Sequence, residues 1–446
     1  MRSVTTLPQL LCIGAGPGNL GLAALARSLT PGQIDIGIIE RRHDLTWHQD
    51  QILPGTTLQN SWYRDLVMSA DPTSHFTFAN FLHRQGRFQR FLSSGITAPS
   101  RAEISQYFQW VGAELGVVET GTQCTSLRYD AASDRFEVGL KTGPLATTRT
   151  ASHISVGTGT TINLFRDRNF AETDSIVYAD ALARSRRCRT AGRILVVGGG
   201  QSGAESFLHA ITAAWDGDTP REVVWITRDS CFRGLDTGHF ARDFFAAGFP
   251  QQFFNLSWAE RQRLNAENVT AGRGISPGTL SRICETLYNG QLSSGPQVQT
   301  RLRPFTEMLE LELRNDQPVA TLRRGTEAAP EVEAFDLVIL CLGHRQGAGA
   351  FAQDMLDLDD MALNPDYSVA CETVPPGRVF LQSDATGSHG LSDTNFVAAP
   401  HRNAIILNSL LDHPHFDTQQ DDLFAEFSPA VPPAPARGAA CLSKFG

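Results

Sequence analysis

The stretch LVVGGGQSGAES, residues 195–206, indicates the fold, because a glycine-rich turn directly after an apolar strand opens a dinucleotide-binding unit. Its Gly198, Gly200 and Gly203 stand in complete G-x-G-x-x-G register. A similar turn stands near the start of the chain, in LLCIGAGPGNLGLAAL, residues 10–25. Each turn is followed by a helix-compatible segment and another strand, so we predict an α/β protein with two Rossmann-like dinucleotide-binding domains.

The first turn has the features of a site for a dinucleotide with an unphosphorylated ribose. Gly14 and Gly16 allow the backbone to bend tightly and approach a pyrophosphate, whose charge the N-terminus of the next helix stabilises. Asn19 occupies the third glycine position, and Gly18 lies in the same turn. The following strand ends in Glu40, a carboxylate that can accept hydrogen bonds from an adenosine ribose. We predict that all five residues contact this dinucleotide.

The second turn differs at the place where the first has its acid. The strand VVWITR delivers Arg228 there, and a guanidinium suits a 2′-phosphate whereas an acid would repel it. This pattern predicts NADPH as the ligand, with Gln201 and Ser202 of the turn as further contacts. The alternative interpretation of Arg228 is a solvated surface side chain, which is common at strand ends.

Two dinucleotide units, one with an acid and one with an arginine, suggest a tightly held FAD and a reducing NADPH. Disulfide reductases share this layout but require a redox-active cysteine pair. The eight cysteines here are scattered singly, with no C-x-x-C motif and no metal-ligand spacing. We therefore expect no metal site, and oxygen is the remaining acceptor for the electrons.

Composition limits the class of protein and its partners. The 446 residues are 41% apolar and 19% charged, which is typical of a globular chain with two or three domains. No apolar run approaches the ~18 residues of a membrane span, and we expect no secretory signal before the first strand. A net charge of −9 argues against a nucleic-acid partner. We expect a cytoplasmic protein with small-molecule ligands and no membrane partner.

Strand and helix patterns along the chain suggest a domain order in which a smaller, partly helical substrate lobe accompanies the two nucleotide domains. The predicted segments are an FAD domain over 1–185, an NADPH domain over 186–230 and 300–345, a substrate lobe over 231–299, a return to the FAD domain and substrate pocket over 346–425, and a disordered Pro/Ala-rich tail over 426–446.

Several longer motifs resemble one family. The chain is similar, from residue 11 to about residue 411, to the flavin-dependent N-hydroxylating monooxygenases, the lysine and ornithine N-monooxygenases of siderophore biosynthesis. The resemblance depends most on the specific order WH, LPG, LQ, DLV and DPTS. The matching stretches are GAGPGNL (14–20), TWHQDQILPGTTLQNSWYRDLVMSADPTSHFTFANFL (46–82), PSRAEISQYFQW (99–110), VVGGGQSGAE (196–205), CLGHR (341–345) and HGLSDTNF (389–396).

The resemblance implies a reaction and cofactor contacts. NADPH reduces FAD, oxygen adds as a C4a-hydroperoxyflavin, and the neutral side-chain amine of lysine or ornithine attacks it to give a hydroxylamine. Such a scheme requires no acid–base side chain, so no residue is predicted as catalytic. Trp47, His48 and Gln59 match positions that line the flavin, and Gln59 is also expected near the amine. A homo-oligomer, tetramer or dimer, is expected as well.

The predicted substrate pocket departs from the family pattern at four positions. Arg64 replaces the lysine that pairs with the substrate carboxylate, Arg242 and Gly272 replace two amides, and Val397 replaces a serine. We predict substrate contacts from Gln59, Arg64, Arg242 and Val397, although a solvated side chain is an equal interpretation of Arg242. The departures leave open a more acidic amino acid or a diamine in place of lysine or ornithine.

Two other functions share parts of this pattern. A Baeyer–Villiger-type flavin monooxygenase would carry an F-x-G-x-x-x-H-x-x-x-W/Y/D segment between the two turns, and none is present. A nonenzymatic flavoprotein has no need for a reductant site, and the intact Gly198 turn with Arg228 argues against it.

Overall fold

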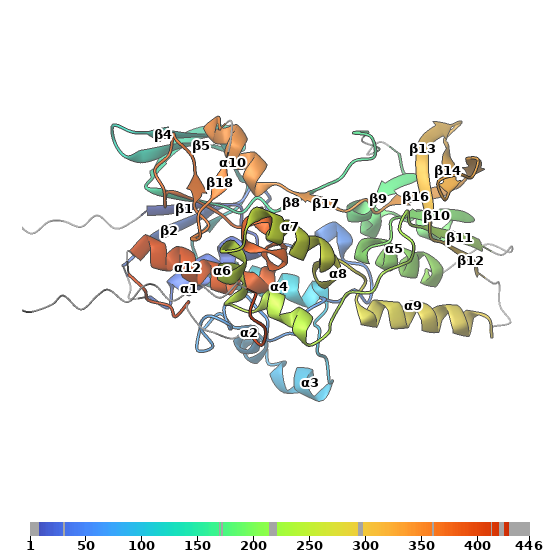
Figure 1. The fold of residues 1–446 in the computed structure, drawn as a ribbon, viewed down its shortest axis with the longest axis horizontal. Helices are drawn as coiled ribbons and strands as arrows, with labels where there is room; N and C mark the ends of the chain where they lie inside the picture. The colour runs from blue at the N-terminus through green and yellow to red at the C-terminus, as the bar shows by residue number, and fades with distance from the viewer. Residues whose placement is uncertain are drawn as a thin grey trace, which may run out of the picture.

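The computed structural model describes residues 9–29, 32–168, 170, 173–213, 221–292, 298–358, 361–411, 413–418 and 423–427. Two five-stranded parallel sheets lie at opposite ends of the molecule, and a two-stranded antiparallel ribbon runs between them (Figure 1). The predicted α/β fold with two dinucleotide-type units is confirmed. No helix in these described ranges is both long enough and apolar enough to cross a bilayer.

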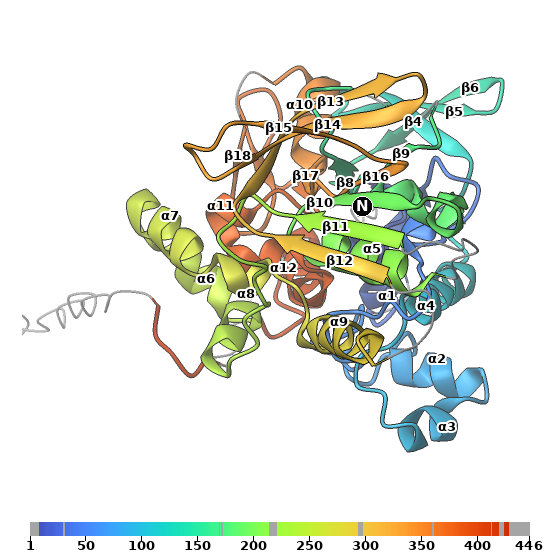
Figure 2. The same cartoon turned by 90° about the vertical axis from the view of Figure 1, so that its right-hand side faces the viewer.

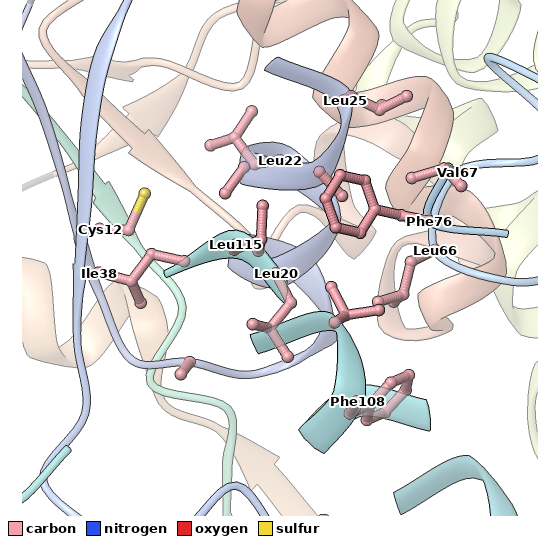
Figure 3. Close-up of a cluster of buried hydrophobic side chains, with 14 of the residues drawn as sticks. Cys12, Leu20, Leu22, Leu25, Ile38, Leu66, Val67, Phe76, Phe108 and Leu115 are labelled. Carbon is pink, nitrogen blue, oxygen red and sulfur yellow. The ribbon is translucent and has the colours of Figure 1, made fainter. Parts of the chain in front are cut away.

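The first sheet surrounds the first glycine turn. Its strand order is β20-β7-β1-β2-β3, with β1 (Gln9–Ile13), β2 (Asp35–Ile39), β3 (Val118–Glu119), β7 (His153–Val156) and β20 (Val379–Leu381). The central strand β1 is apolar because both of its faces are covered. On one face it packs against α1 (Pro17–Ala26), α4 (Arg101–Leu115) and α12 (Ala399–Leu411), and the side chains of Leu20, Leu22 and Phe108 fill this core (Figure 3).

The second sheet repeats this arrangement around the second glycine turn. Its order is β12-β11-β10-β16-β9, with β9 (Ile176–Tyr178), β10 (Arg193–Val197), β11 (Arg221–Ile226), β12 (Val298–Arg303) and β16 (Leu337–Leu340). The helix α5 (Gln201–Thr212) follows the turn and covers one face together with α9 (Pro277–Gly290). Phe207 and Trp225 stack there at 4.8 Å between ring centroids.

Each unit also carries a three-stranded antiparallel meander, which comes directly before β7 in the first unit and before β16 in the second. In the first unit this is β4 (Thr122–Asp130), β5 (Arg135–Thr142) and β6 (Leu145–Ala151); in the second it is β13 (Thr306–Arg314), β14 (Gln317–Arg324) and β15 (Glu331–Ala334). The two units therefore share one topology, in which a strand, helix and strand lead to a third strand, a meander and a fourth strand.

The two crossings between the units pair with each other. Strand β8 (Thr160–Ile162) leads out of the first unit and β17 (His344–Gln346) leads back, with Ile162 opposite His344. The first unit was predicted to extend to residue 185, but β9 pairs with β16, so the second unit already includes residue 176. A strand of three residues is too short for its periodicity to identify the sheet to which it belongs.

A helical lobe is inserted between β11 and β12. It contains η4 (Phe240–Phe245), α6 (Phe249–Phe254), α7 (Trp258–Glu267) and α8 (Val269–Gly272), which lie to one side of the second sheet (Figure 2). Its core is aromatic, with Phe244, Phe249 and Phe253. Helix α9, which falls inside the predicted lobe range 231–299, instead packs on the second sheet, where Ile283 joins the core of that unit.

The predicted disordered tail is wrong for its first two residues. Phe427 packs against the lobe, with ring centroids 5.5 Å from Phe244 and 5.1 Å from Phe249, because an aromatic side chain within a Pro/Ala-rich segment still finds an apolar surface. The rest of the predicted tail, residues 428–446, lies outside the described residues.

The remaining short elements are η1 (Gln49–Gln51), α2 (Phe78–Arg84), α3 (Phe88–Ser93), η2 (Ala179–Arg184), η3 (Arg187–Arg189), α10 (Ala348–Leu356), β18 (Ala362–Leu363), β19 (Val369–Ala370), α11 (Thr386–His389), η5 (Leu391–Thr394) and η6 (Phe396–Ala398).

Candidate active site

A cavity of about 770 Å³ opens at the carboxyl ends of β1, β2 and β7. This is the edge where parallel α/β sheets bind their ligands. Six of the residues predicted to hold the flavin line it: Gly16, Gly18, Glu40, Trp47, His48 and Gln59. Its volume is in the range of cofactor sites, which run from about 300 to 1,000 Å³.

The first glycine turn is fixed by backbone geometry and by one carboxylate. Gly14 has φ +91°, and a Cβ at this position would lie closer than 3.0 Å to the carbonyl oxygen of Gly157. Glu40 is buried, and its carboxylate accepts hydrogen bonds from the backbone N–H groups of Ala15 and Arg42, both at 2.9 Å. Glu40 thereby connects the end of β2 to the turn while it still lines the cavity.

Asn19 has a structural role in this turn. It is fully buried, and its Nδ2 donates to the carbonyl oxygens of Ile13 at 3.2 Å and Gly14 at 2.8 Å. Its Oδ1 accepts from Ser155 Oγ at 2.7 Å. The polar atoms of this side chain bind β1 and β7, and Asn19 does not line the cavity, so its side chain gives no support to the predicted cofactor contact.

Trp47 and His48 form one wall of the cavity. Their rings meet edge to face at 4.2 Å between centroids, and Trp47 also packs against Phe108 and Phe396. Burial, with a smaller contribution from the positive charge of Arg101, lowers the pKa of His48 to about 3. His48 is thus neutral near pH 7, so one ring nitrogen can donate and the other can accept a hydrogen bond, and the ring does not act as an imidazolium acid.

The floor of the cavity includes a buried ion pair that the sequence did not reveal. Arg402 Nη1 lies 2.6 Å from Asp393 Oδ1, and the exposed fractions of the two side chains are 3% and 0%. Arg402 Nε also donates to Gln382 Oε1 at 3.1 Å. Asp393 lies within the quoted HGLSDTNF motif, whereas Arg402, on helix α12, carried no local signal.

The cavity also contains a buried hydroxyl that suits a polar ligand. Ser383 Oγ lines it and has no hydrogen-bond partner among the described residues. A buried polar group without a partner is costly, so such an atom is expected to meet a ligand or water. Together with the glycine turn and Glu40, this hydroxyl fits a large polar cofactor such as FAD.

A smaller cavity of about 100 Å³ adjoins the large one and shares Gln59, Asn60, Phe245, Gly272 and Asn395 with it. Three of the predicted substrate residues line it, namely Gln59, Arg64 and Arg242, together with Asp236. The side chains of Arg64 and Arg242 make no ion pair or hydrogen bond within the described ranges. Two unpaired guanidinium groups in one cavity favour an anionic group of a ligand.

Val397 lies outside both cavities. It is buried in η6, and its backbone N–H donates to Asn395 Oδ1 at 3.1 Å. Its predicted substrate contact is therefore not supported, because the apolar side chain points into the core. Asn395, two residues earlier, lines both cavities instead.

Gln59 lies where the two nucleotide units meet. Its Nε2 donates to Gly274 O at 3.1 Å and to Gln201 Oε1 at 3.3 Å. Gln201 begins helix α5 directly after the second glycine turn, and its Oε1 also accepts from the backbone N–H of Ser276 at 2.8 Å. The amide of Gln201, predicted as an NADPH contact, is thus engaged between the two units.

A buried salt bridge reinforces this junction. Arg101 Nη2, from α4 of the first unit, lies 3.0 Å from Glu205 Oε2 in α5 of the second, and the two side chains are 13% and 6% exposed. Burial raises the pKa of Glu205, while the Arg101 charge lowers it.

The second glycine turn lies outside the large cavity. Gly198 has φ +124°, and a Cβ there would lie closer than 3.0 Å to Cys341 O, so β10 and β16 approach closely at the turn. Gly200 faces open space, and Ser202 is half-buried. Arg228 is exposed just after β11 and makes no ion pair with the described residues.

Comparison with known proteins identifies relatives along most of the chain. The model of the family described as L-lysine 6-monooxygenase/L-ornithine 5-monooxygenase matches residues 7–346. The L-lysine N6-monooxygenase of Escherichia coli is 26% identical over 411 residues, which cover 91% of this chain and 95% of that protein. The putrescine N-hydroxylase of Shewanella oneidensis is 27% identical over 442 residues, which cover 95% and 85%.

Solved structures share the fold. The FAD-bound cadaverine monooxygenase of Erwinia amylovora matches with a TM-score of 0.85 at 22% identity, covering 96% of this chain and all of that one. The ornithine hydroxylase of Pseudomonas aeruginosa matches with a TM-score of 0.81 at 23% identity, over 92% of this chain and all of that chain.

Proposed function

The chain belongs to the L-lysine 6-monooxygenase/L-ornithine 5-monooxygenase family, and we propose that it hydroxylates the side-chain amine of an amino acid such as lysine or ornithine. It is a flavin-dependent N-monooxygenase that uses FAD and NADPH. FAD is assigned to the large cavity and the amine substrate to the small one. The second glycine turn, with Arg228 beside it, is assigned to NADPH.

One observation supports an amino acid most directly. Arg64 and Arg242 line the cavity that shares Gln59 with the flavin site, and neither guanidinium has an ionic partner among the described residues. A carboxylate bound by one or both arginines would place the far end of an extended substrate toward Gln59. The fork of an arginine can bind a carboxylate through two parallel hydrogen bonds.

The residues of the site position the substrate. Bound FAD, once reduced by NADPH, supplies the chemistry that activates oxygen. The Gln59 amide has a carbonyl oxygen that can accept a hydrogen bond from the substrate amine, while its Nε2 remains tied to Gly274 and Gln201. The Trp47 and His48 rings close the wall beside it. We assign no side chain as a proton acceptor, so the amine must lose its ammonium proton to solvent.

A diamine is the second candidate substrate, and Asp236 favours it. Its carboxylate lines the small cavity together with the two arginines. An ammonium group could pair with this acid, and the Shewanella oneidensis relative carries the name putrescine N-hydroxylase. A more acidic amino acid is the third candidate, because a second carboxylate would use the second arginine.

A panel of amines tests the proposal. Lysine, ornithine, putrescine, cadaverine and aspartate are each incubated with FAD-loaded enzyme and NADPH, and hydroxylamine is measured against NADPH oxidised. We expect coupled product with lysine or ornithine. In Arg64→Ala the KM for that amino acid should rise roughly 10- to 100-fold, as for loss of a hydrogen bond to a charged group. In Arg64→Lys, which keeps the positive charge, the KM should rise less. Product from diamines alone, unaffected by Arg64→Ala, would contradict an amino-acid substrate.

Two further properties concern the location and the assembly of the enzyme. A reducing cytoplasm suits the seven cysteines of the described residues, all of which are free thiols. A homo-oligomer, tetramer or dimer, is the state expected from the family resemblance. Sedimentation of the purified enzyme tests the second property, and a single monomeric species would contradict it.

A further inference from the structure

A short segment near the C-terminus is docked on the substrate lobe. Residues 423–427, here called the C-terminal strap, meet η4 and α6 through the main chain. The backbone N–H groups of Phe424 and Ala425 donate to Asp243 Oδ2 at 3.0 and 2.9 Å. The N–H of Phe427 donates to Gln252 Oε1 at 2.7 Å. The strap thus binds two elements that lie about 180 residues earlier in the chain.

Asp243 is the central residue of this contact. It is 4% exposed, and a buried carboxylate is stable only when hydrogen bonds or charges compensate for lost water. The two strap N–H groups supply such bonds, which are of the stronger, charge-assisted kind. The ring of Phe427 adds apolar contact, since it packs on Phe244 next to Asp243 and on Phe249.

The element that carries Asp243 also forms walls of both cavities. Arg242, its immediate neighbour, lines the small cavity, and Phe245 lines the small and the large one. The aromatic core beneath the strap includes Ala271, from the small cavity, and Leu391, from the large one. A change in the strap therefore acts on the lobe core and, through it, on the surfaces that meet the substrate.

We propose that Asp243 is a positioning residue for the amine substrate, because it locks the C-terminal strap onto η4 and so fixes Arg242 and Phe245 at the cavities. This inference rests on the proposed function, since it takes the small cavity as the amine site. The Asp243 carboxylate itself faces the strap and touches no reacting group. We therefore expect its loss to change the KM for the amine and the coupling. Coupling is the amount of hydroxylamine formed per NADPH oxidised.

Two truncations and two matched pairs of point variants test the proposal. One truncation ends at residue 422 and removes the strap, and the other ends at residue 427 and retains it. Phe427→Ala removes the packed ring, whereas Phe424→Ala removes a ring from the same segment that is 87% exposed. Asp243→Ala removes the acceptor, and Asp243→Asn keeps one carbonyl oxygen for the strap as the conservative rescue.

For each variant, we measure KM and kcat for the amine, coupling, FAD content and hydrogen exchange of the amides in residues 240–254. Loss of the strap, Phe427→Ala and Asp243→Ala should each raise KM about tenfold, well within the ~100-fold that a 1 Å misplacement can cost. Asp243→Asn should recover part of the affinity lost in Asp243→Ala. Coupling should fall, and exchange over 240–254 should accelerate. FAD content and flavin reduction by NADPH should stay at the level of the full chain. The truncation at 427 and Phe424→Ala should match the full chain in every measurement.

Equal KM and coupling in the two truncations would overturn the proposal. Loss of FAD together with the strap would overturn it as well, because the segment would then maintain global stability and not the amine site. Hydrogen exchange does not depend on the substrate, so it reports on the strap even if no amine is hydroxylated. Absence of hydroxylamine from the full chain with every amine would instead count against the proposed function.

Discussion

Around the first glycine turn the polar side chains face inward, whereas around the second they are exposed or engaged with the other unit. Glu40 is buried and holds two backbone N–H groups at the rim of the large cavity. In the second unit Thr227 stands at the place of Glu40, and Arg228, one residue further on, is exposed and unpaired among the described residues. From each glycine turn onward, the next strands and the meander follow the same order in both units. The contrast suits one cofactor that stays bound and another that enters and leaves, and it gives the two turns different sensitivities to mutation.

The largest effect is expected from the backbone of the second turn. In Gly198→Ala the new Cβ would crowd Cys341 O at a φ that favours glycine, so overpacking and strain together should cost about 3 kcal/mol in that unit. The melting temperature and the rate of flavin reduction by NADPH should both fall, while FAD content remains. Gly200→Ala is the control, since no atom lies within 4 Å of its Cβ. An equal loss of melting temperature in Gly200→Ala would show that the crowding at Gly198 is not the cause.

Exchanging the charge at the second turn should have the next largest effect. Arg228→Glu is expected to raise the KM for NADPH roughly 10- to 100-fold, the range for losing a hydrogen bond between charged groups. The KM for NADH, which lacks the 2′-phosphate, should change little. Arg228→Lys keeps the charge and should retain most of the preference for NADPH. A parallel change for both nucleotides would remove Arg228 from 2′-phosphate recognition and leave the solvated interpretation.

The sequence predicted the two units because their signals are local. A strand, a glycine turn and a terminal acid or arginine lie within about 30 residues, and the period of the apolar residues identifies the elements. The edge strands of each sheet are harder to assign from sequence, because β9 and β20 have three residues each and pair with strands that are far away along the chain. β20 lies in the first sheet, within the range 346–425 expected to return to that domain, whereas β9 pairs in the second sheet although its residues fell in the range 1–185 expected for the first.

The sequence could predict a residue of the candidate site where the type of the residue and its place in a motif were enough to suggest its role. Glu40, Trp47 and Gln59 reach the cavity as expected, and Arg64 and Arg242 line one small cavity although 178 positions separate them. Asn19, within the first glycine motif, and Val397, directly after HGLSDTNF, show the limit, because sequence position did not reveal that their side chains are buried. The Arg402–Asp393 pair and the strap contact at Asp243 depend on tertiary packing between distant segments, which no local pattern encodes.

A smaller effect is expected when the acid of the first unit is neutralised. Glu40→Gln leaves one acceptor oxygen for the N–H groups of Ala15 and Arg42, so one of them loses its partner. The affinity for FAD should fall roughly tenfold, near the lower end for a hydrogen bond to a charged group. Titration of FAD-free protein by fluorescence measures it, and the KM for NADPH serves as the internal control. Unchanged FAD affinity would mean that the first turn depends on its backbone alone.

The smallest effect concerns His48, the half-buried histidine of the first cavity. The pKa of His48 is about 3 in the folded protein because of burial, compared with about 6.5 in an unfolded chain. Between these values the unfolded state binds more protons, so the free energy of unfolding rises with pH, and this stability is lost as pH falls from 6.5 toward 3. The slope from one histidine is at most about 1.4 kcal/mol per pH unit.

His48→Asn removes this slope and is compatible with the backbone, since His48 has φ +50° and asparagine tolerates that region. Melting temperatures between pH 7 and 4 should therefore decline less steeply in the variant than in the parent. Part of the decline should remain, because burial also lowers the pKa of His153 and His389, each to about 4. His43→Asn, at an exposed position nearby, should follow the parent curve. Identical curves for His48→Asn and the parent would mean that the first cavity admits water and a proton at His48, and the contrast between an enclosed first turn and an open second one would then weaken.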